Sequence, residues 1–358
     1  MAKSPSKPFK LAIIGTGGIS HAHATGYSKL GDQVQIVAGC DIKQSALDSF
    51  CAKWGKDIRQ YKDYNEMLRE EKDVDAVSVC TPNGVHRDPT IAALNAGKHV
   101  IVEKPMAMNP GECEKMIAAA RKAKKKLVIG FQYRYHPNTR FIKRAVDDGR
   151  FGDIMFVKCL ALRRRGIPNW GVFGQKKLQG GGPMIDIGVH CLEMAHYAIG
   201  SPEPEAAVGS CFTYLGNKPS NVFCSWPNWD HKTYTVEDLA VGHIRMKNGV
   251  VIHIEAAFAC HIEKDVWNFQ IMGEKGGCRW DPPAIFTDRA GHMTNYSPTH
   301  TGSGGFDALF ASKLRNWVDA CLYNKPLEAP GEAGLAVQKI LDGVYRSAAN
   351  GGKEVAID

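Results

Sequence analysis

The chain has 358 residues, of which 44% are hydrophobic and 23% are charged, a composition typical of a globular protein of two domains. The formal net charge of +8 is mostly scattered and has no interleaved aromatic residues, so we expect no nucleic-acid surface. Eleven cysteines without a CxxC pair argue against a disulfide framework or a structural zinc site and favour a cytoplasmic location. The polar N-terminus and the lack of an apolar run of roughly 18 residues predict no signal peptide and no membrane span.

Short apolar runs alternate with helical segments in the first part of the chain. The expected strands are Leu11–Gly15, Val34–Cys40, Ala76–Cys80, His99–Val102 and Leu127–Phe131. The expected helices are Ser20–Leu30, Gln44–Trp54, Asp63–Glu71, Pro89–Ala96 and Gly111–Lys126. This alternation predicts βαβ units and an open, doubly wound parallel sheet over residues 1–132.

The pattern changes to one dominated by strands in the rest of the chain. Helices are expected in Arg140–Gly149 and Gly180–Gly200, and strands over Ile154–Leu162, Val208–Tyr214, Leu239–Met246, Val250–Phe258 and Trp267–Met272. Asn248-Gly249 is a strong hairpin signal. The amphipathic helices Phe306–Tyr323 and Glu332–Asn350 either complete the second domain or pack back on the first. We therefore predict an α+β domain with an open, largely antiparallel sheet over residues 133–358.

A glycine-rich turn, Gly15-Thr16-Gly17-Gly18-Ile19-Ser20, joins the first expected strand to the first helix. Gly15 permits the tight turn, and Gly17 lets the backbone approach a pyrophosphate at the helix N-terminus. Ser20 stands where glycine or alanine is usual, which is a small departure from the motif. This context predicts a Rossmann-type domain that binds a nicotinamide dinucleotide; the alternative is a structural turn in an empty domain.

Asp41 follows the second expected strand. A carboxylate at this point accepts hydrogen bonds from the ribose hydroxyls and repels a 2′-phosphate. The sequence therefore favours NAD over NADP, with the nearby Lys43 as the argument for NADP.

Two further segments carry side chains suited to acid–base chemistry. Glu103-Lys104-Pro105 follows a strand at the edge where ligands bind, so Lys104 can approach the nicotinamide and a substrate hydroxyl; a surface lysine at a turn is the alternative. Asp186 and His190 are four residues apart and share one face of a helix that is otherwise apolar. Such a pair is costly unless it is used or paired, and the alternative is a core histidine satisfied by its helix neighbour.

The combination of these motifs resembles the Gfo/Idh/MocA family of sugar and cyclitol oxidoreductases over almost the whole chain. The residues that carry the resemblance are the glycine turn at 15–18, Asp41, Thr81-Pro82-Asn83 with His86, Glu103-Lys104-Pro105, and the glycine-rich run with Asp186 and His190.

The resemblance implies hydride transfer between NAD and a secondary hydroxyl or ketone of a sugar, a sugar derivative or an inositol. His190 is then the general acid/base, Asp186 orients or tunes it, and Lys104 stabilises the reacting oxygen. Whether Lys104 or His190 takes the proton stays open. The implied cofactor contacts are Gly15, Thr16, Gly17, Gly18, Ile19, Asp41, Thr81, Pro82, Asn83, His86, Glu103, Lys104 and Gln132, the last in place of a frequent asparagine.

Weaker candidates for substrate binding follow the strand at 154–162. On a strand, Arg163 and Arg165 point the same way and suit an acidic or phosphorylated sugar, although a solvated edge or a subunit contact is the alternative. Trp170 is a candidate for stacking on a sugar or for the core. Four histidines are expected to make local hydrogen bonds rather than to bind metal: His21, His23, His86 and His196.

Two other functions remain open at this point. One is an NAD-dependent glycoside hydrolase or lyase that acts through a transient keto-sugar, and the other is a non-catalytic NAD-binding sensor. An apolar open sheet needs a cover, and family members commonly pack this sheet between subunits, so we expect a homodimer or homotetramer.

Overall fold

The computed structural model describes residues 7–358, and their contacts define two compact units. The first unit ends at Tyr135 and resumes over Gly304–Leu335, and the second comprises His136–Ser303 and Ala336–Asp358. Helix α9 (Phe306–Tyr323) therefore belongs to the first unit although the chain reaches it only after most of the second.

The first unit contains a six-stranded parallel sheet with the strand order β3-β2-β1-β4-β5-β6. Its strands are β1 (Phe9–Ile14), β2 (Val34–Cys40), β3 (Arg59–Tyr61), β4 (Ala76–Val79), β5 (His99–Val102) and β6 (Leu127–Ile129). The side chains of β1 from Leu11 onward and of all of β4 are buried, as both faces of a parallel sheet require. The predicted doubly wound sheet is confirmed.

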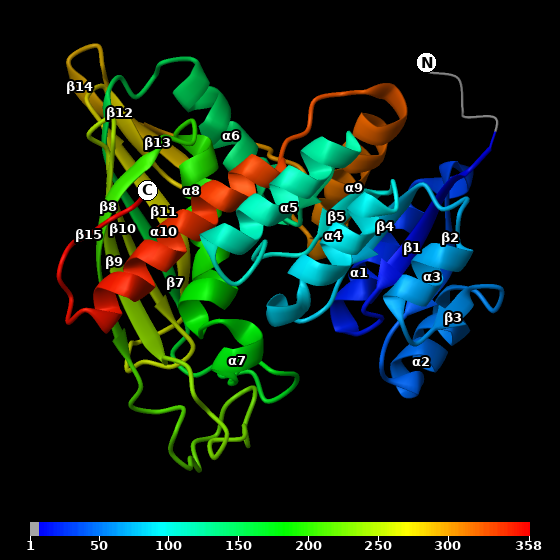
Figure 1. The fold of residues 1–358 in the computed structure, drawn as a ribbon. Helices are drawn as coiled ribbons and strands as arrows, with labels where there is room; N and C mark the ends of the chain where they lie inside the picture. The colour runs from blue at the N-terminus through cyan, green and yellow to red at the C-terminus, as the bar shows by residue number, and fades with distance from the viewer. Residues whose placement is uncertain (1–6) are drawn as a thin grey trace. The chain divides into compact units, whose positions relative to one another are not determined.

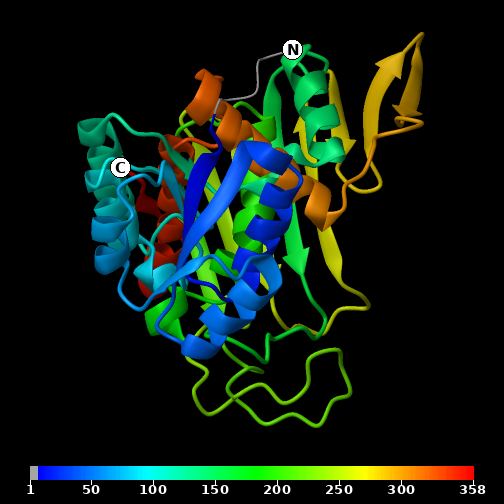
Figure 2. The same ribbon diagram turned by 90° about the vertical axis from the view of Figure 1, so that its right-hand side faces the viewer.

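Helices cover both faces of this sheet (Figures 1 and 2). They are α1 (Gly18–Ser28), α2 (Gln44–Trp54), α3 (Tyr64–Glu70), α4 (Arg87–Asn95), α5 (Pro110–Ala123) and α9, with short 3₁₀ turns at η1 (Gly31–Gln33), η2 (Asn83–Val85) and η3 (Gln132–Tyr135). Helices α3, α4 and α5 are neighbours along one face, and α1 packs against α9 on the other. The contact is close because Gly26 has no side chain: a Cβ there would lie 2.6 Å from Leu314.

The strand order places β1 beside β4, where the winding of the sheet reverses direction. The loops that leave the carboxyl ends of these two strands diverge, and this is where open α/β sheets bind ligands. The glycine-rich turn follows β1, and Thr81-Pro82-Asn83 begins two residues after β4.

The second unit contains a nine-stranded sheet with the order β14-β13-β12-β11-β7-β10-β9-β8-β15. Its strands are β7 (Ile154–Leu162), β8 (Pro204–Phe212), β9 (Leu239–Met246), β10 (Val251–Ala257), β11 (Val266–Gly273), β12 (Gly276–Arg279), β13 (Ala284–Arg289), β14 (His292–Tyr296) and β15 (Val355–Ala356). Every neighbouring pair is antiparallel except β7 and β10, which confirms the largely antiparallel sheet. The β9–β10 hairpin turns at Gly249 with φ +86°.

Helices pack on one face of this sheet (Figure 1). They are α6 (Pro137–Asp147), α7 (Lys176–Gln179), the π-helical turn η4 (Met184–Gly188), α8 (Val189–Ala198) and the part of α10 (Gly331–Ala349) that follows Ala336. Val344 of α10 approaches Gly209 of β8 and Gly242 of β9 so closely that a Cβ on either glycine would lie within 2.8 Å of it. Within residues 7–358, no helix is both long and apolar enough to cross a membrane.

Candidate active site

The glycine-rich turn has the shape of a phosphate cradle. Gly15 has φ +87°, and a Cβ there would lie 2.7 Å from the backbone carbonyl carbon of Cys80, so only glycine fits. At Gly17 and Gly18 a Cβ would meet nothing within 4 Å, so this side of the turn is open. Gly17 caps α1 without a side-chain hydrogen bond, which leaves the first N–H groups of the helix available to an anion.

Asp41 is held beside this turn at the end of β2. Its Oδ2 accepts the backbone N–H of Thr16 at 2.9 Å, and its Oδ1 accepts the backbone N–H of Lys43 at 2.8 Å. The two bonds fix the carboxylate at the position predicted to hold the adenosine ribose.

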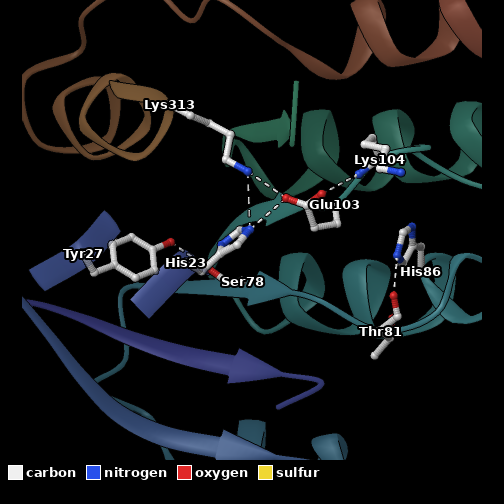
Figure 3. Close-up of polar contacts among 8 residues, drawn as sticks. All are labelled: His23, Tyr27, Ser78, Thr81, His86, Glu103, Lys104 and Lys313. Atoms are coloured by element: carbon white, nitrogen blue, oxygen red, sulfur yellow. Dashed lines mark hydrogen bonds and ion pairs between the residues drawn. The ribbon is translucent and has the colours of Figure 1, made fainter. Parts of the chain in front are cut away.

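His86 joins the loops that follow β4 and β5. Its ring nitrogens lie 2.8 Å from the carbonyl oxygen of Thr81 and 2.8 Å from that of Pro105, and the contact with Thr81 is visible in Figure 3. Burial lowers the pKa of this imidazole. The prediction that His86 makes local hydrogen bonds is confirmed, and its geometry shows it bracing the loop that contains Thr81, Pro82 and Asn83.

Gln132 supplies a buried side-chain oxygen that can accept a hydrogen bond from a ligand. The side chain, in η3 after β6, is 3% exposed, and its Oε1 has no hydrogen-bond partner among the described residues. A buried acceptor of this kind is costly unless a ligand donates to it, as the carboxamide of nicotinamide can. The cradle at Gly15, the carboxylate of Asp41 and this orphaned oxygen together fit a nicotinamide dinucleotide.

Glu103 lies at the carboxyl end of β5, and its carboxylate belongs to a buried ionic network. Oε1 is 2.9 Å from Nε2 of His23 and 2.7 Å from Nζ of Lys313, and Oε2 accepts the backbone N–H of Lys104 at 3.3 Å (Figure 3). Burial opposes ionisation of Glu103, but the Lys313 ammonium and the bond from His23 outweigh it and hold the pKa well below its usual range. The sequence suggested Glu103 as a cofactor contact and gave no sign of Lys313.

The glycine run at 180–182 in the second unit begins the segment that carries Asp186 and His190. A Cβ on Gly181 would collide with the hydroxyl of Tyr345, and one on Gly182 would collide with the backbone oxygen of Glu237. The buried Glu237 carboxylate accepts the backbone N–H of Gly182 at 2.9 Å and the hydroxyl of Tyr345 at 2.7 Å. Burial raises the pKa of Glu237. The sequence reasoning missed this anchor because its partners are distant in the chain.

Asp186 and His190 are 7% and 9% exposed, and the ring of His190 lies 6.3 Å from that of Trp267. The sequence predicts a regular α-helix here, which is wrong for Met184–Gly188: this segment is a π-helical turn, and α8 begins only at Val189. The wider turn still leaves Asp186 and His190 about one helical turn apart along the segment. Turns of this type occur frequently at functional sites.

The arginines at 163 and 165 lie beyond the end of β7, so a strand does not align them as predicted. The guanidinium of Arg163 lies 4.9 Å from the ring centroid of Trp226 and donates to the carbonyl oxygen of Gly166 at 3.0 Å. Arg165 contacts His261 instead. Trp170, 49% exposed, meets Trp226 edge to face at 4.8 Å, so Arg163, Trp170 and Trp226 form one aromatic cluster.

A doubly wound sheet with this cradle, carboxylate and buried acceptor defines a dinucleotide-binding protein. Residues 9–131 match the family described as the GFO_IDH_MocA oxidoreductase family with an NAD-binding Rossmann fold, and residues 139–279 match the GFO/IDH/MocA C-terminal domain. The protein therefore belongs to the Gfo/Idh/MocA family and is an NAD-dependent oxidoreductase, as the motifs predicted. No cluster of residues suited to a metal ion occurs in the described part of the chain.

Relatives of known activity cover nearly the whole chain. D-glucoside 3-dehydrogenase of Escherichia coli is 35% identical over 97% of both chains, and glucose-6-phosphate 3-dehydrogenase of Bacillus subtilis is 26% identical over 95% of this chain and 97% of its own. Levoglucosan dehydrogenase in complex with NADH superposes with a TM-score of 0.84, covers 98% of this chain and 99% of its own, and is 21% identical. That structure confirms the fold of both units.

Proposed function

We propose that the protein oxidises the hydroxyl on carbon 3 of a glucoside and reduces NAD. The observation that carries this proposal is the 35% identity with D-glucoside 3-dehydrogenase over 97% of both chains. The intact cradle and the presence of Lys104, Asp186 and His190 support a catalytic protein rather than a sensor.

The proposed roles follow from the chemistry of these three side chains. Bound NAD supplies the acceptor for the hydride that leaves the carbon. Lys104 donates a hydrogen bond to the reacting oxygen and stabilises the negative charge that develops there. His190 takes the hydroxyl proton, and Asp186 orients the imidazole. The carbon loses two electrons and becomes a ketone, and one proton passes to His190.

The aromatic cluster of Arg163, Trp170 and Trp226 is the proposed platform for the sugar. The half-exposed ring of Trp170 offers an apolar face to the C–H groups of a pyranose. The guanidinium of Arg163 contacts the ring of Trp226 and donates to the carbonyl oxygen of Gly166, so it supports this platform. We keep Arg165 as a second candidate for contact with the substrate.

A substrate panel tests this function. The purified protein with NAD is offered alkyl and aryl glucosides, glucose 6-phosphate and myo-inositol, with NADH followed by absorbance and products by NMR. We expect one NADH for each 3-keto-glucoside formed, and loss of both in Lys104→Met. Release of the aglycone without net NADH would instead identify a redox-assisted lyase. Binding of NAD without turnover of any compound would identify a sensor.

We also propose that the protein is a cytoplasmic homodimer or homotetramer that assembles through the face of the nine-stranded sheet opposite the helices. On β10 the residues Ile252, Ile254 and Ala256 are buried on the helix side, whereas Val251, His253 and Glu255 stay partly exposed. The outward row on β10 and its two neighbouring strands is partly apolar and includes Phe156, Leu160, Val241 and Val251. Light scattering at micromolar concentration tests this assembly, and a monomer would contradict it.

A further inference from the structure

A buried ionic network adjoins the turn that carries Lys104 (Figure 3). Three of its titratable members are His23 on α1, Glu103 at the end of β5 and Lys313 on α9, and their side chains are 0%, 5% and 1% exposed. Three elements from opposite ends of the chain therefore meet at one carboxylate. Burying an ion pair costs desolvation free energy, so we expect a functional reason for this network.

The protonation states in this network determine which group donates each hydrogen bond. Burial, followed by the nearby Lys313, lowers the pKa of His23 to about 4, so its imidazole is neutral. Its Nε2–H then donates to Glu103, and its Nδ1 accepts the hydroxyl of Ser78 at 3.4 Å. The Tyr27 hydroxyl lies 2.6 Å from Ser78 and completes the chain. One ammonium thus balances one carboxylate, and the neutral groups orient them.

The Glu103 carboxylate and the Lys313 ammonium are closely packed by their neighbours. A Cβ on Gly130 would lie 2.5 Å from Oε1, so the absence of a side chain at Gly130 makes the space that this oxygen occupies. The Nζ of Lys313 lies 3.7 Å from the ring centroid of Phe310, which holds the ammonium from the other side.

The second oxygen of the same carboxylate accepts the backbone N–H of Lys104 at 3.3 Å. The backbone N–H of Lys104 is therefore hydrogen-bonded to the Glu103 carboxylate, which Lys313 and His23 hold in place. We propose that Lys313 is a positioning residue that fixes Lys104 through Glu103. This inference rests on the proposed role of Lys104 at the reacting oxygen and adds a residue 209 positions further along the chain.

The test compares Lys313→Met with the double variant Glu103→Gln/Lys313→Met. The single variant leaves an unbalanced buried carboxylate, whereas the double variant is neutral and recovers most of the lost Tm. We expect kcat to fall about tenfold or more in both, because a small misplacement of a catalytic group is costly. The Kd of NAD, set by the glycine turn and Asp41, should stay within about threefold if Lys104 supplies little of the binding energy. Lys98→Met removes another buried lysine, at the opposite end of β5, and should keep wild-type kcat.

Each outcome separates the inference from the proposed function. If kcat recovers together with Tm in the double variant, Lys313 contributes packing alone and the inference is wrong. If Lys104→Met is inactive while Lys313→Met and the double variant keep wild-type kcat, the inference is again wrong but the proposed function stands. If Lys104→Met itself keeps wild-type kcat, the proposed role of Lys104 fails first. If Lys313→Met does not fold, the kcat of the double variant alone tests the inference.

Discussion

The choice between NAD and NADP should depend on one carboxylate. Asp41→Asn keeps the size of the side chain but removes its charge. In the native protein both carboxylate oxygens accept backbone N–H groups, from Thr16 at 2.9 Å and from Lys43 at 2.8 Å. The asparagine can keep one of these bonds through its amide oxygen, whereas its NH₂ group faces a donor.

Two terms set the size of the expected effect. A hydrogen bond to a charged group is worth about 1 kcal/mol more than a neutral one, so NAD binding should weaken by about fivefold to tenfold. Two unit negative charges about 5 Å apart repel by about 3 kcal/mol at an effective dielectric constant of about 20, and by less where water screens them. Removing this repulsion should shift the preference toward NADP by about tenfold to a hundredfold.

The assay measures the Kd of both cofactors by fluorescence titration and their kcat/KM with the best glucoside. Asp48→Asn is the matched control, because Asp48 lies on α2 and its carboxylate accepts the side-chain amide of Gln44 at 2.9 Å. If the ratio of the Kd values of NAD and NADP is the same in Asp41→Asn as in the native protein, Asp41 does not discriminate between the two ribose groups.

Three further predictions concern single residues. His190→Ala should lower kcat/KM by about a hundredfold or more, measured by initial rates across pH, whereas His196→Gln on the same helix should not; near-normal rates at all pH values would exclude His190 as the acid/base. Gly15→Ala should abolish NAD binding in a calorimetric titration, whereas Gly249→Ala, with nearly the same φ but open space around its Cβ, should cost about 1 kcal/mol of stability and leave binding intact; equal effects would show that the collision with Cys80 is unimportant. Because the pKa of His23 is about 4 in the folded chain and about 6.5 when unfolded, its contribution to stability is present above pH 6.5 and is lost as the pH falls toward 4. Between pH 7 and pH 5 the native protein should therefore lose about 2 kcal/mol more than His23→Gln in urea unfolding, and equal losses would contradict the assignment.

The sequence was sufficient for the fold class because hydrophobic periodicity is local. The alternation of buried runs and helices predicted the parallel sheet, and Asn248-Gly249 predicted the β9–β10 hairpin. Two of the strands that it missed are short or polar: β3 has three residues, Arg59–Tyr61, and β14 is almost fully exposed. Such segments acquire their strand conformation from a neighbour in the sheet rather than from their own pattern.

The site was predictable where a motif is contiguous and not where it is assembled by the fold. Gly15 and Asp41 are close to the strands that position them, so their geometry followed from spacing. Lys313 is 210 residues from Glu103, and nothing in the pattern of α9 distinguishes it from a surface lysine. The anchor of the glycine run by Glu237 is hidden for the same reason.

The π-helical turn at Met184–Gly188 shows a different limit of sequence patterns. An i, i+4 spacing is compatible with both an α-helix and a π-helical turn, so the sequence pattern does not distinguish the two. The close approach of Gly188 to Ala256, where a Cβ would lie 2.9 Å away, becomes apparent only once the sheet is in place.

The most direct measurement follows the hydrogen that is proposed to move. A glucoside deuterated on carbon 3 is incubated with the enzyme and NAD, and the reduced cofactor and the sugar are analysed by mass spectrometry. Direct hydride transfer predicts that the deuterium is recovered in the reduced cofactor and that a 3-keto-sugar accumulates in equal amount. Deuterium that remains in the sugar, or that is lost to water without reduced cofactor, would contradict oxidation at that carbon.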